Sequence, residues 1–432
     1  MTLAEVRLWG ERVGAVSLAQ GEETATFQYD PAFVAHGYEV APIEMPRREA
    51  PYSFPALARE SFDGLPGLLA DSLPDRYGHA LIDAWLASQG RTPESFDAVE
   101  RLCYVGRRGM GALEFEPAQG PDPSAGGAIE VEALGELAAE ILSRRGALSV
   151  SLDRPDKRRA MEDILRVGTS AGGARAKAIV ALNPDTGEVR SGQLDLDPGF
   201  EHWILKFDGV DDGSRELGGG RGYGQIEWVY SQLAGRAGIE MADCRLFAEG
   251  ERRHFMTRRF DRLADGSKLH MQSLGALAHV DFNQPGANGY EQAFQVIREL
   301  GLPRDDIDQQ FRRMVFNVVA RNQDDHVKNI AFLMDRDGAW HLSPAFDVAY
   351  AYNPGGRWTA QHQMSINGKR ADHTLEDFRS VGRLASMKRG APERIVAEVT
   401  EAVSAWPELA AEAGIEAVRI QSIAGTLRLD LS

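Results

Sequence analysis

The sequence is poor in cysteine, in basic charge and in long apolar runs, and each shortage excludes a class of protein. Its 432 residues include two cysteines, Cys103 and Cys244, which are too few for a disulfide framework and suit a reducing compartment. Lysine and arginine number 48 against 64 aspartates and glutamates, and the net charge of −16 argues against direct DNA binding by this chain. No stretch approaches the roughly 18 uncharged apolar residues of a membrane span, so we expect a soluble, cytoplasmic protein.

What remains is a globular composition, with 43% hydrophobic residues in a chain long enough for two or three domains. A Pro-, Gly- and Ser-rich stretch over residues 117–128 is typical of a linker. Before it, apolar and polar residues alternate around Gly10 and Gly14, which predicts strands, and residues 51–90 have helical spacing. Beyond it, the patterns predict strands at 176–183, 202–209 and 253–262, and helices at 226–238, 290–300, 306–322 and 392–406.

The most informative run is an acidic loop, Asn322-Gln-Asp-Asp-His-Val-Lys-Asn329, which directly precedes an apolar strand. Asp337-Gly338 then predicts a hairpin turn, and Asp347 follows the second strand. Because a hairpin brings its two ends together, Asp324, Asn329 and Asp347 are expected to converge. Phosphoryl transfer is commonly built in this way, with one aspartate beside the substrate hydroxyl and an asparagine and a second aspartate on Mg²⁺.

Two other interpretations of this loop stay open at the level of sequence. Consecutive aspartates before a histidine also occur in turns and helix caps, where they carry no chemistry. A transition-metal site made by Asp325, His326 and Asp347 is the weaker alternative, because no second histidine stands three or four residues from the first.

A second group of candidate residues lies upstream. Residues 168–173 form a Gly-rich run before a strand, which would let backbone N–H groups approach phosphates, although it lacks the Lys-Ser/Thr of a Walker A loop. Lys206 stands in an apolar strand and Glu227 on the following helix, which is how protein kinases place the ion pair that binds ATP phosphates. We expect the adenine to bond the backbone between Thr257 and Phe260. Each part is a weak signal alone, and their kinase-like order strengthens the hypothesis.

In these runs the chain resembles the HipA-type serine/threonine kinases, which are toxins of bacterial type II toxin–antitoxin modules. The resemblance covers nearly the whole chain. It includes RLWGERVGAVSL, FDGLPGLLADSLPD and GRRGMGALEFEP in the N-terminal part, and SAGGARAK, ILKF, FMTRRFDR, NQDDHVKN and SPAFDV in the remainder. It implies an α+β, protein-kinase-like two-lobed fold with a β-rich N-terminal subdomain and small lobe and an all-α C-lobe. We divide the chain accordingly into 1–120, 128–262 and 263–432.

The resemblance also implies roles for individual residues. Asp324 would be the catalytic base, Asn329 and Asp347 the Mg²⁺ ligands, and Ser170 a loop serine whose autophosphorylation silences the enzyme by ejecting the loop from the ATP site. Lys328 would neutralise the transferring phosphoryl group or else pair with Asp325. The residues expected to contact ATP are Ser170, Gly172, Gly173, Lys177, Lys206, Glu227, Arg258, Phe260 and Lys328.

Members of this family phosphorylate translation proteins, notably aminoacyl-tRNA synthetases, and so arrest growth, and they bind a small DNA-binding antitoxin of the HipB type. The resemblance therefore implies an ATP- and Mg-dependent serine/threonine protein kinase with such partners, linked to persistence. Two alternatives remain: a small-molecule kinase, and a non-catalytic co-regulator of transcription that binds the antitoxin. The serine within the phosphate loop favours the protein kinase, and the co-regulator predicts no Mg²⁺-dependent ATP turnover.

Overall fold

The structure is a computed structural model that describes residues 1–120, 129–143, 163–165, 167–168, 175–193, 196–210 and 221–431. Ser170, Gly172 and Gly173 of the predicted phosphate loop lie outside the described residues. Within those ranges, no helix is long and apolar enough to cross a membrane.

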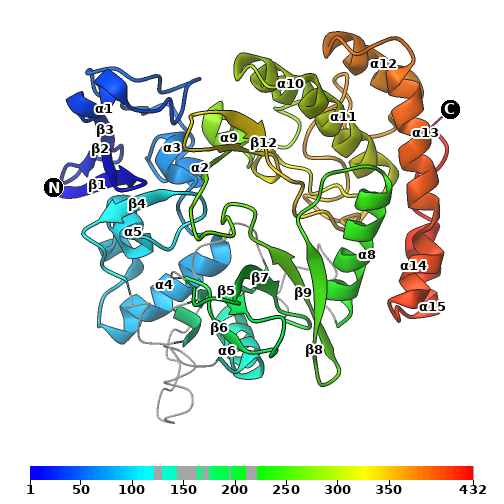
Figure 1. Cartoon of the computed structure of the whole chain (residues 1–432), viewed down its shortest axis with the longest axis horizontal. Helices are drawn as coiled ribbons and strands as arrows, with labels where there is room; N and C mark the ends of the chain where they lie inside the picture. The colour runs from blue at the N-terminus through cyan, green and yellow to red at the C-terminus, as the bar shows by residue number, and fades with distance from the viewer. Residues whose placement is uncertain are drawn as a thin grey trace. The chain divides into compact units, whose positions relative to one another are not determined.

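The described strands form three sheets, and Figure 1 labels most of these strands. The first sheet has the order β3-β2-β1-β4 and contains β1 (Thr2–Leu8), β2 (Glu11–Leu18), β3 (Thr26–Tyr29) and β4 (Leu113–Glu116). The second has the order β6-β5-β7-β9-β8, with β5 (Lys177–Leu182), β6 (Val189–Ser191), β7 (Glu201–Lys206), β8 (Cys244–Glu249) and β9 (Arg252–Arg258). The third has the order β10-β11-β12, with β10 (His270–Ser273), β11 (Ala331–Met334) and β12 (Trp340–Leu342).

The chain divides into two compact units. The first contains residues 1–213, 256–272 and 333–339, and the second contains 214–255, 273–332 and 340–432. The helices of the first unit are α1 (Pro31–His36), α2 (Arg59–Phe62), α3 (Gly67–Ala70), α4 (Arg76–Ser88), η1 (Pro93–Ser95), α5 (Ala98–Val105) and α6 (Val131–Ser143). Those of the second are α8 (Tyr223–Arg236), α9 (Leu274–Leu277), α10 (Tyr290–Glu299), α11 (Arg304–Val319), η2 (Val327–Asn329), α12 (Leu375–Leu384), α13 (Ala391–Ser404), α14 (Trp406–Glu412) and α15 (Ala417–Ala424).

In the first unit, the alternation seen in the sequence produces a half-buried antiparallel sheet. Ala4, Val6 and Leu8 of β1 are buried while the residues between them are more exposed, as the two-residue period of a strand requires. Leu8 pairs with Glu11, so the turn consists of Trp9 and Gly10, and both have positive φ values, of 52° and 87°. That combination defines the tight turn whose twist suits a hairpin.

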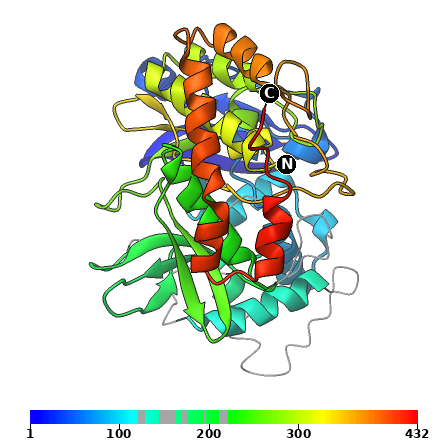
Figure 2. The same cartoon turned by 90° about the vertical axis from the view of Figure 1, so that its right-hand side faces the viewer.

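In the second unit, amphipathic helices pack against one another. Figures 1 and 2 both show α13 running alongside α11 and α8, and these helices are in contact. The core includes Trp406, Tyr230 and Phe316, whose rings meet edge to face around Tyr230. This packing fixes the C-terminal end of α11, from which the acidic loop begins.

The predicted fold class is confirmed. The structure combines sheet-rich and helix-rich parts in a protein-kinase-like, two-lobed fold, and the helices at 290–299, 304–319 and 391–404 match their predicted ranges closely. The C-terminal region also carries the small β10-β11-β12 sheet, two of whose strands the hairpin pattern predicted. Our three-part division at 1–120, 128–262 and 263–432 stays a prediction.

Candidate functional site

The acidic loop leaves α11 through a sharp backbone turn. Arg321 has a positive φ of 58°, and Asn322 beyond it forms a parallel bridge with Ala351. The backbone N–H of Ala351 donates to the carbonyl of Arg321 at 3.1 Å. The strand-like bridge therefore holds the acidic loop beside the segment that follows Asp347.

The amide of Asn329 closes the acidic loop on itself. Its Nδ2 donates to the backbone oxygen of Asp324 at 2.8 Å. Since an amide nitrogen cannot bind a metal, this bond leaves Oδ1 of Asn329 as the atom able to face a cation. The Asp324 side chain is 36% exposed, and its Oδ1 lies 3.9 Å from Nε2 of His326. Asp324 is thus reachable by a substrate, as a catalytic base must be.

Asp347 occupies an unusual backbone conformation for a residue other than glycine. Its φ is 54°, in the left-handed region that aspartate tolerates better than most residues. It follows the β11–β12 hairpin, whose turn includes Gly338 with a φ of 81°, as the Asp-Gly pair predicted. Strained positions of this kind cluster at functional sites, and this one sets the direction of a predicted Mg²⁺ ligand.

Asp325, the neighbour of Asp324, has a different environment: it is buried and fully paired. Its Oδ2 accepts from the hydroxyl of Tyr290 and lies at the same distance, 2.8 Å, from Nδ1 of His362. Its Oδ1 accepts from the backbone N–H of Gln363 at 2.7 Å. The Tyr290 hydroxyl also accepts from Asn317 on α11. These bonds anchor the acidic loop to α10, α11 and the segment around residue 362.

The electrostatics of Asp325 follow from these contacts. Burial raises the pKa of its carboxyl, but the charge of His362 and hydrogen bonds from His362, Tyr290 and the Gln363 amide bring it below its ordinary value. Burial and the nearby carboxylate raise the pKa of Tyr290 well above its usual value, so its hydroxyl keeps its proton. Asp325 therefore remains an acceptor and positions the loop, a role that the sequence did not reveal because its partners lie more than 30 residues away.

Two details of the sequence interpretation change here. The Lys328 ammonium lies 4.4 Å from the centre of the Phe282 ring, a cation–π distance, while Asp325 bonds Tyr290, His362 and Gln363. Among the described residues, no group of three or more His, Cys, Asp or Glu side chains could hold a metal ion. The transition-metal interpretation of Asp325, His326 and Asp347 thus finds no support.

The lysines predicted to meet ATP phosphates lie on one face of the second sheet. Lys177 of β5 pairs directly with Lys206 of β7 in the antiparallel register, so their side chains project from the same face. The Lys177 ammonium is buried and lies 2.8 Å from Oδ2 of Asp75, which also caps the N-terminus of α4. Burial raises the pKa of Asp75, and the Lys177 charge opposes that rise. Asp75 thus offsets the repulsion between neighbouring lysines, which sequence analysis missed.

The remaining predicted contacts are placed as follows. Arg258 ends β9, and its Nη2 lies 3.5 Å from Oε1 of Glu201 on β7. Phe260 stands two residues beyond β9 and is half-buried. Glu227 is buried on α8 in the second unit, while Lys206 belongs to the first, so their ion pair stays a prediction.

Comparison with known protein families identifies the group to which this fold and loop belong. The architecture is that of a protein-kinase-like, two-lobed chain. A family model described as the HipA N-terminal domain matches residues 4–116, and one described as the HipA-like C-terminal domain matches residues 169–406. The second match spans more than half of the sequence, and the chain belongs to the HipA family. No curated protein sequence matches significantly.

A solved structure supports the same fold. HipA of Shewanella oneidensis MR-1, in a complex with HipB and operator DNA, superposes with a TM-score of 0.67 at 15% identity, over 98% of this chain and 94% of that chain. This likeness establishes a shared fold. The Helicobacter pylori proinflammatory kinase CtkA is less similar, with a TM-score of 0.31 and 12% identity over 52% of this chain and 92% of that chain.

Proposed function

We propose that this HipA-family protein is an ATP- and Mg-dependent serine/threonine protein kinase. The observation that carries the proposal is the closure of the acidic loop, in which the Asn329 amide bonds the Asp324 backbone and the Asn322–Ala351 bridge holds the loop beside the Asp347 segment. The three residues that phosphoryl transfer needs flank one hairpin, and they belong to the second unit. The half-exposed Asp324 would accept the substrate proton.

The oxygen atoms of Asp347 and Asn329 are suitable ligands for Mg²⁺. Asp347 offers a carboxylate and Asn329 an amide oxygen, and oxygen ligands with few protein carboxylates are what Mg²⁺ prefers. When bound, Mg²⁺ would neutralise charge on the phosphates of ATP. Lys206 would bind the phosphates, with Lys177, whose charge Asp75 offsets, beside it on the same face of the sheet. Catalysis would then rest on positioning and charge neutralisation, with the proton of the acceptor hydroxyl passing to Asp324.

We further propose the regulation and the partners that the family implies. Ser170 would be autophosphorylated, the protein substrate would be a translation protein such as an aminoacyl-tRNA synthetase, and a HipB-like antitoxin would bind the chain. The solved HipA relative was captured with HipB and operator DNA, which supports the antitoxin part of this proposal. Growth arrest, linked to persistence, would follow from phosphorylation of the translation protein.

The test is incubation of the pure full chain with ATP and Mg²⁺, followed by mass spectrometry. Trypsin cleaves after Arg166 and Arg175, so residues 167–175 form one peptide, in which fragment ions distinguish Ser170 from Thr169. We expect phosphate on Ser170 in the wild type and in Asp337→Asn, a matched change at the exposed hairpin turn. We expect none in Asp324→Asn, since loss of a general base costs about 100-fold or more in rate.

Other outcomes would change the proposal. A fully active Asp324→Asn protein would remove Asp324 as the base. Phosphate transfer to an added sugar or aminoglycoside, with no phosphopeptide, would favour a small-molecule kinase. Failure to bind Mg·ATP by calorimetry would favour the non-catalytic co-regulator.

A further inference from the structure

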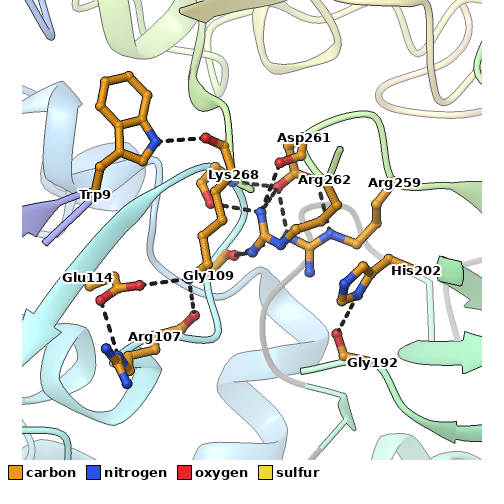
Figure 3. A network of polar contacts seen from close by, with 11 residues as sticks. Trp9, Arg107, Gly109, Glu114, Gly192, His202, Arg259, Asp261, Arg262 and Lys268 are labelled. Atoms are coloured by element: carbon orange, nitrogen blue, oxygen red, sulfur yellow. Dashed lines mark hydrogen bonds and ion pairs between the residues drawn. The ribbon is translucent and has the colours of Figure 1, made fainter. Parts of the chain in front are cut away.

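A buried polar cluster outside the acidic loop lies directly after β9, and Figure 3 shows it from close by. Asp261 is fully buried, and the side chains of Arg259 and Arg262 are 1% and 7% exposed. Arg259 binds Asp261 through two nitrogens, at 2.9 and 2.7 Å, and Arg262 binds Oδ2 at 2.8 Å. Such a buried group of charges holds its residues in one geometry, because few other arrangements satisfy every donor.

The same cluster forms hydrogen bonds with the loop that precedes β4 of the N-terminal sheet. The backbone N–H of Gly111 donates to Oδ2 of Asp261 at 2.7 Å, and the Gly111 oxygen accepts from Arg262 at 2.9 Å. The Gly109 oxygen accepts from both arginines, at 3.1 Å each. Gly111 has a φ of 74°, and an added Cβ would lie 3.0 Å from the Met271 nitrogen, so the close approach favours glycine. We call Arg259, Asp261, Arg262 and the backbone of Gly109 and Gly111 the clamp.

A second set of contacts holds the other end of the same segment. The Lys268 ammonium lies 2.8 Å from Oε1 of Glu114 on β4 and donates to the Arg107 oxygen at 3.1 Å. The indole N–H of Trp9, at the β1–β2 turn, donates to the Lys268 oxygen at 2.7 Å. The N-terminal sheet therefore fixes residues 259–268 at both ends, within a single compact unit.

The clamped segment also continues the backbone that we expect to bond adenine. The N–H of Arg259 donates to the His202 oxygen at 3.0 Å, which holds the segment to β7, four residues before Lys206. We infer that the clamp is a positioning device through which the N-terminal sheet sets the affinity of the small lobe for ATP. Arg262 acts without touching the nucleotide, by holding residues 257–260 in the conformation that binds it. This inference rests on the proposed ATP site.

The thermodynamic consequence is specific. If the clamp is broken, only a fraction of the molecules hold residues 257–260 in the conformation that binds the nucleotide. The apparent dissociation constant for the nucleotide then rises by the inverse of that fraction. The coupling is reciprocal, so nucleotide binding must also tighten the clamp. If Arg262 merely stabilised the fold, its replacement would lower the melting temperature, and nucleotide binding would have no effect on the loop at residues 109–111.

The experiment compares Arg262→Met with Arg107→Met in the full chain. Both remove one arginine from the same network, but the Arg107 side chain is 72% exposed, and its Nε lies 3.1 Å from Oε2 of Glu114. Calorimetry with Mg·AMP-PNP should show binding weakened roughly tenfold in Arg262→Met, a typical size for coupling between sites. Arg107→Met should bind like the wild type. In hydrogen exchange, Mg·AMP-PNP should slow the amides of residues 106–113 in the wild type and not in Arg262→Met.

Each other outcome is decisive. Equal affinity in Arg262→Met and the wild type, or equal weakening by both substitutions, would overturn the inference. If Arg262→Met does not melt cooperatively, Arg262→Lys replaces it, because lysine keeps the charge but cannot donate to two carbonyls as a planar fork. Unchanged affinity in that variant would likewise overturn the inference. A wild type that binds no Mg·AMP-PNP would instead remove the proposed function, and the inference with it.

Discussion

Asp261 in the first unit and Asp325 in the second are both fully buried, yet they are held by different kinds of donor. Asp261 accepts from two arginines and one backbone amide, and the arginines stand within two residues of it (Figure 3). Asp325 accepts from a tyrosine and a backbone amide and bonds a histidine, all distant in sequence. Guanidinium groups stay charged at any pH at which proteins fold, whereas a phenol is neutral and an imidazole can lose its proton.

The difference separates two ways of anchoring a loop. Around Asp261, the charges of Arg259 and Arg262 outweigh the effect of burial and hold the pKa of the carboxyl below its usual range. The clamp therefore depends on charge, and an uncharged isostere should fail there. Around Asp325, the charge of His362 is joined by hydrogen bonds from His362, Tyr290 and the Gln363 amide, so uncharged donors share in lowering the pKa of the carboxyl. The predictions below test this contrast, beginning with the largest expected effect.

Asp261→Asn should be the most destabilising single change in either anchor. It leaves two buried guanidiniums without a carboxylate, and removal of one partner of a buried ion pair costs about 3–5 kcal/mol of unfolding free energy. Chemical denaturation of the full chain measures the loss. The control is Asp265→Asn in the exposed turn of the same segment, which should change stability by less than about 0.5 kcal/mol. Equal effects of the two changes would show that charge does not hold the clamp.

Asp325→Asn should destabilise the protein by a smaller amount, about 1–3 kcal/mol, because the new amide keeps one acceptor and its N–H groups can meet the Tyr290 oxygen or a neutral imidazole of His362. The same denaturation experiment measures it. The rate of Ser170 phosphorylation should fall as well, since the acidic loop loses its anchor. A stability loss as large as that of Asp261→Asn would contradict the contrast.

The two anchors also show how far a sequence can predict a site. The residues of the proposed active site, Asp324, Asn329 and Asp347, were visible because one hairpin with an Asp-Gly turn joins them. The strands before Gly14 and the long C-terminal helices were visible because burial follows their periodicity. The clamp was not, although Arg259 and Asp261 are only two residues apart in sequence, because its other half lies 150 residues away. The predicted strand at 253–262 accordingly ends at Arg258, where the clamp begins.

His202, which lies beside the clamp, should make the stability of the protein depend on pH. Burial, followed by the charges of Arg259 and Arg262, lowers its pKa from 6.5 to about 4. Between these values the unfolded chain binds a proton that the folded protein does not, so stability falls as the pH falls through this window. The loss from this residue should be about 2 kcal/mol between pH 7 and pH 5.

Denaturation of the wild type and His202→Gln across this pH range isolates the contribution. Glutamine can still donate to the Gly192 oxygen, which lies 3.0 Å from Nδ1 of His202, but it does not titrate. From pH 7 to pH 5, the stability of the wild type should fall by about 2 kcal/mol relative to that of His202→Gln. Parallel curves would mean that neither burial nor the positive charge of the clamp lowers the pKa of His202 in the folded protein.

The smallest expected effect belongs to Tyr290→Phe. It removes one hydrogen bond from Asp325 and the weaker neutral bond that the Tyr290 hydroxyl accepts from Asn317, while Asp325 keeps its bonds with His362 and Gln363. The loss should be about 1 kcal/mol of unfolding free energy. Tyr29→Phe is the matched change, because the Tyr29 hydroxyl is also buried and donates once, to the Met45 oxygen at 2.8 Å. Both variants should lose similar stability, whereas only Tyr290→Phe should slow phosphorylation of Ser170, since only it loosens the acidic loop. Equal rates in the two variants would reduce the Asp325 network to a purely structural anchor, unlike the clamp, whose effect is on nucleotide affinity.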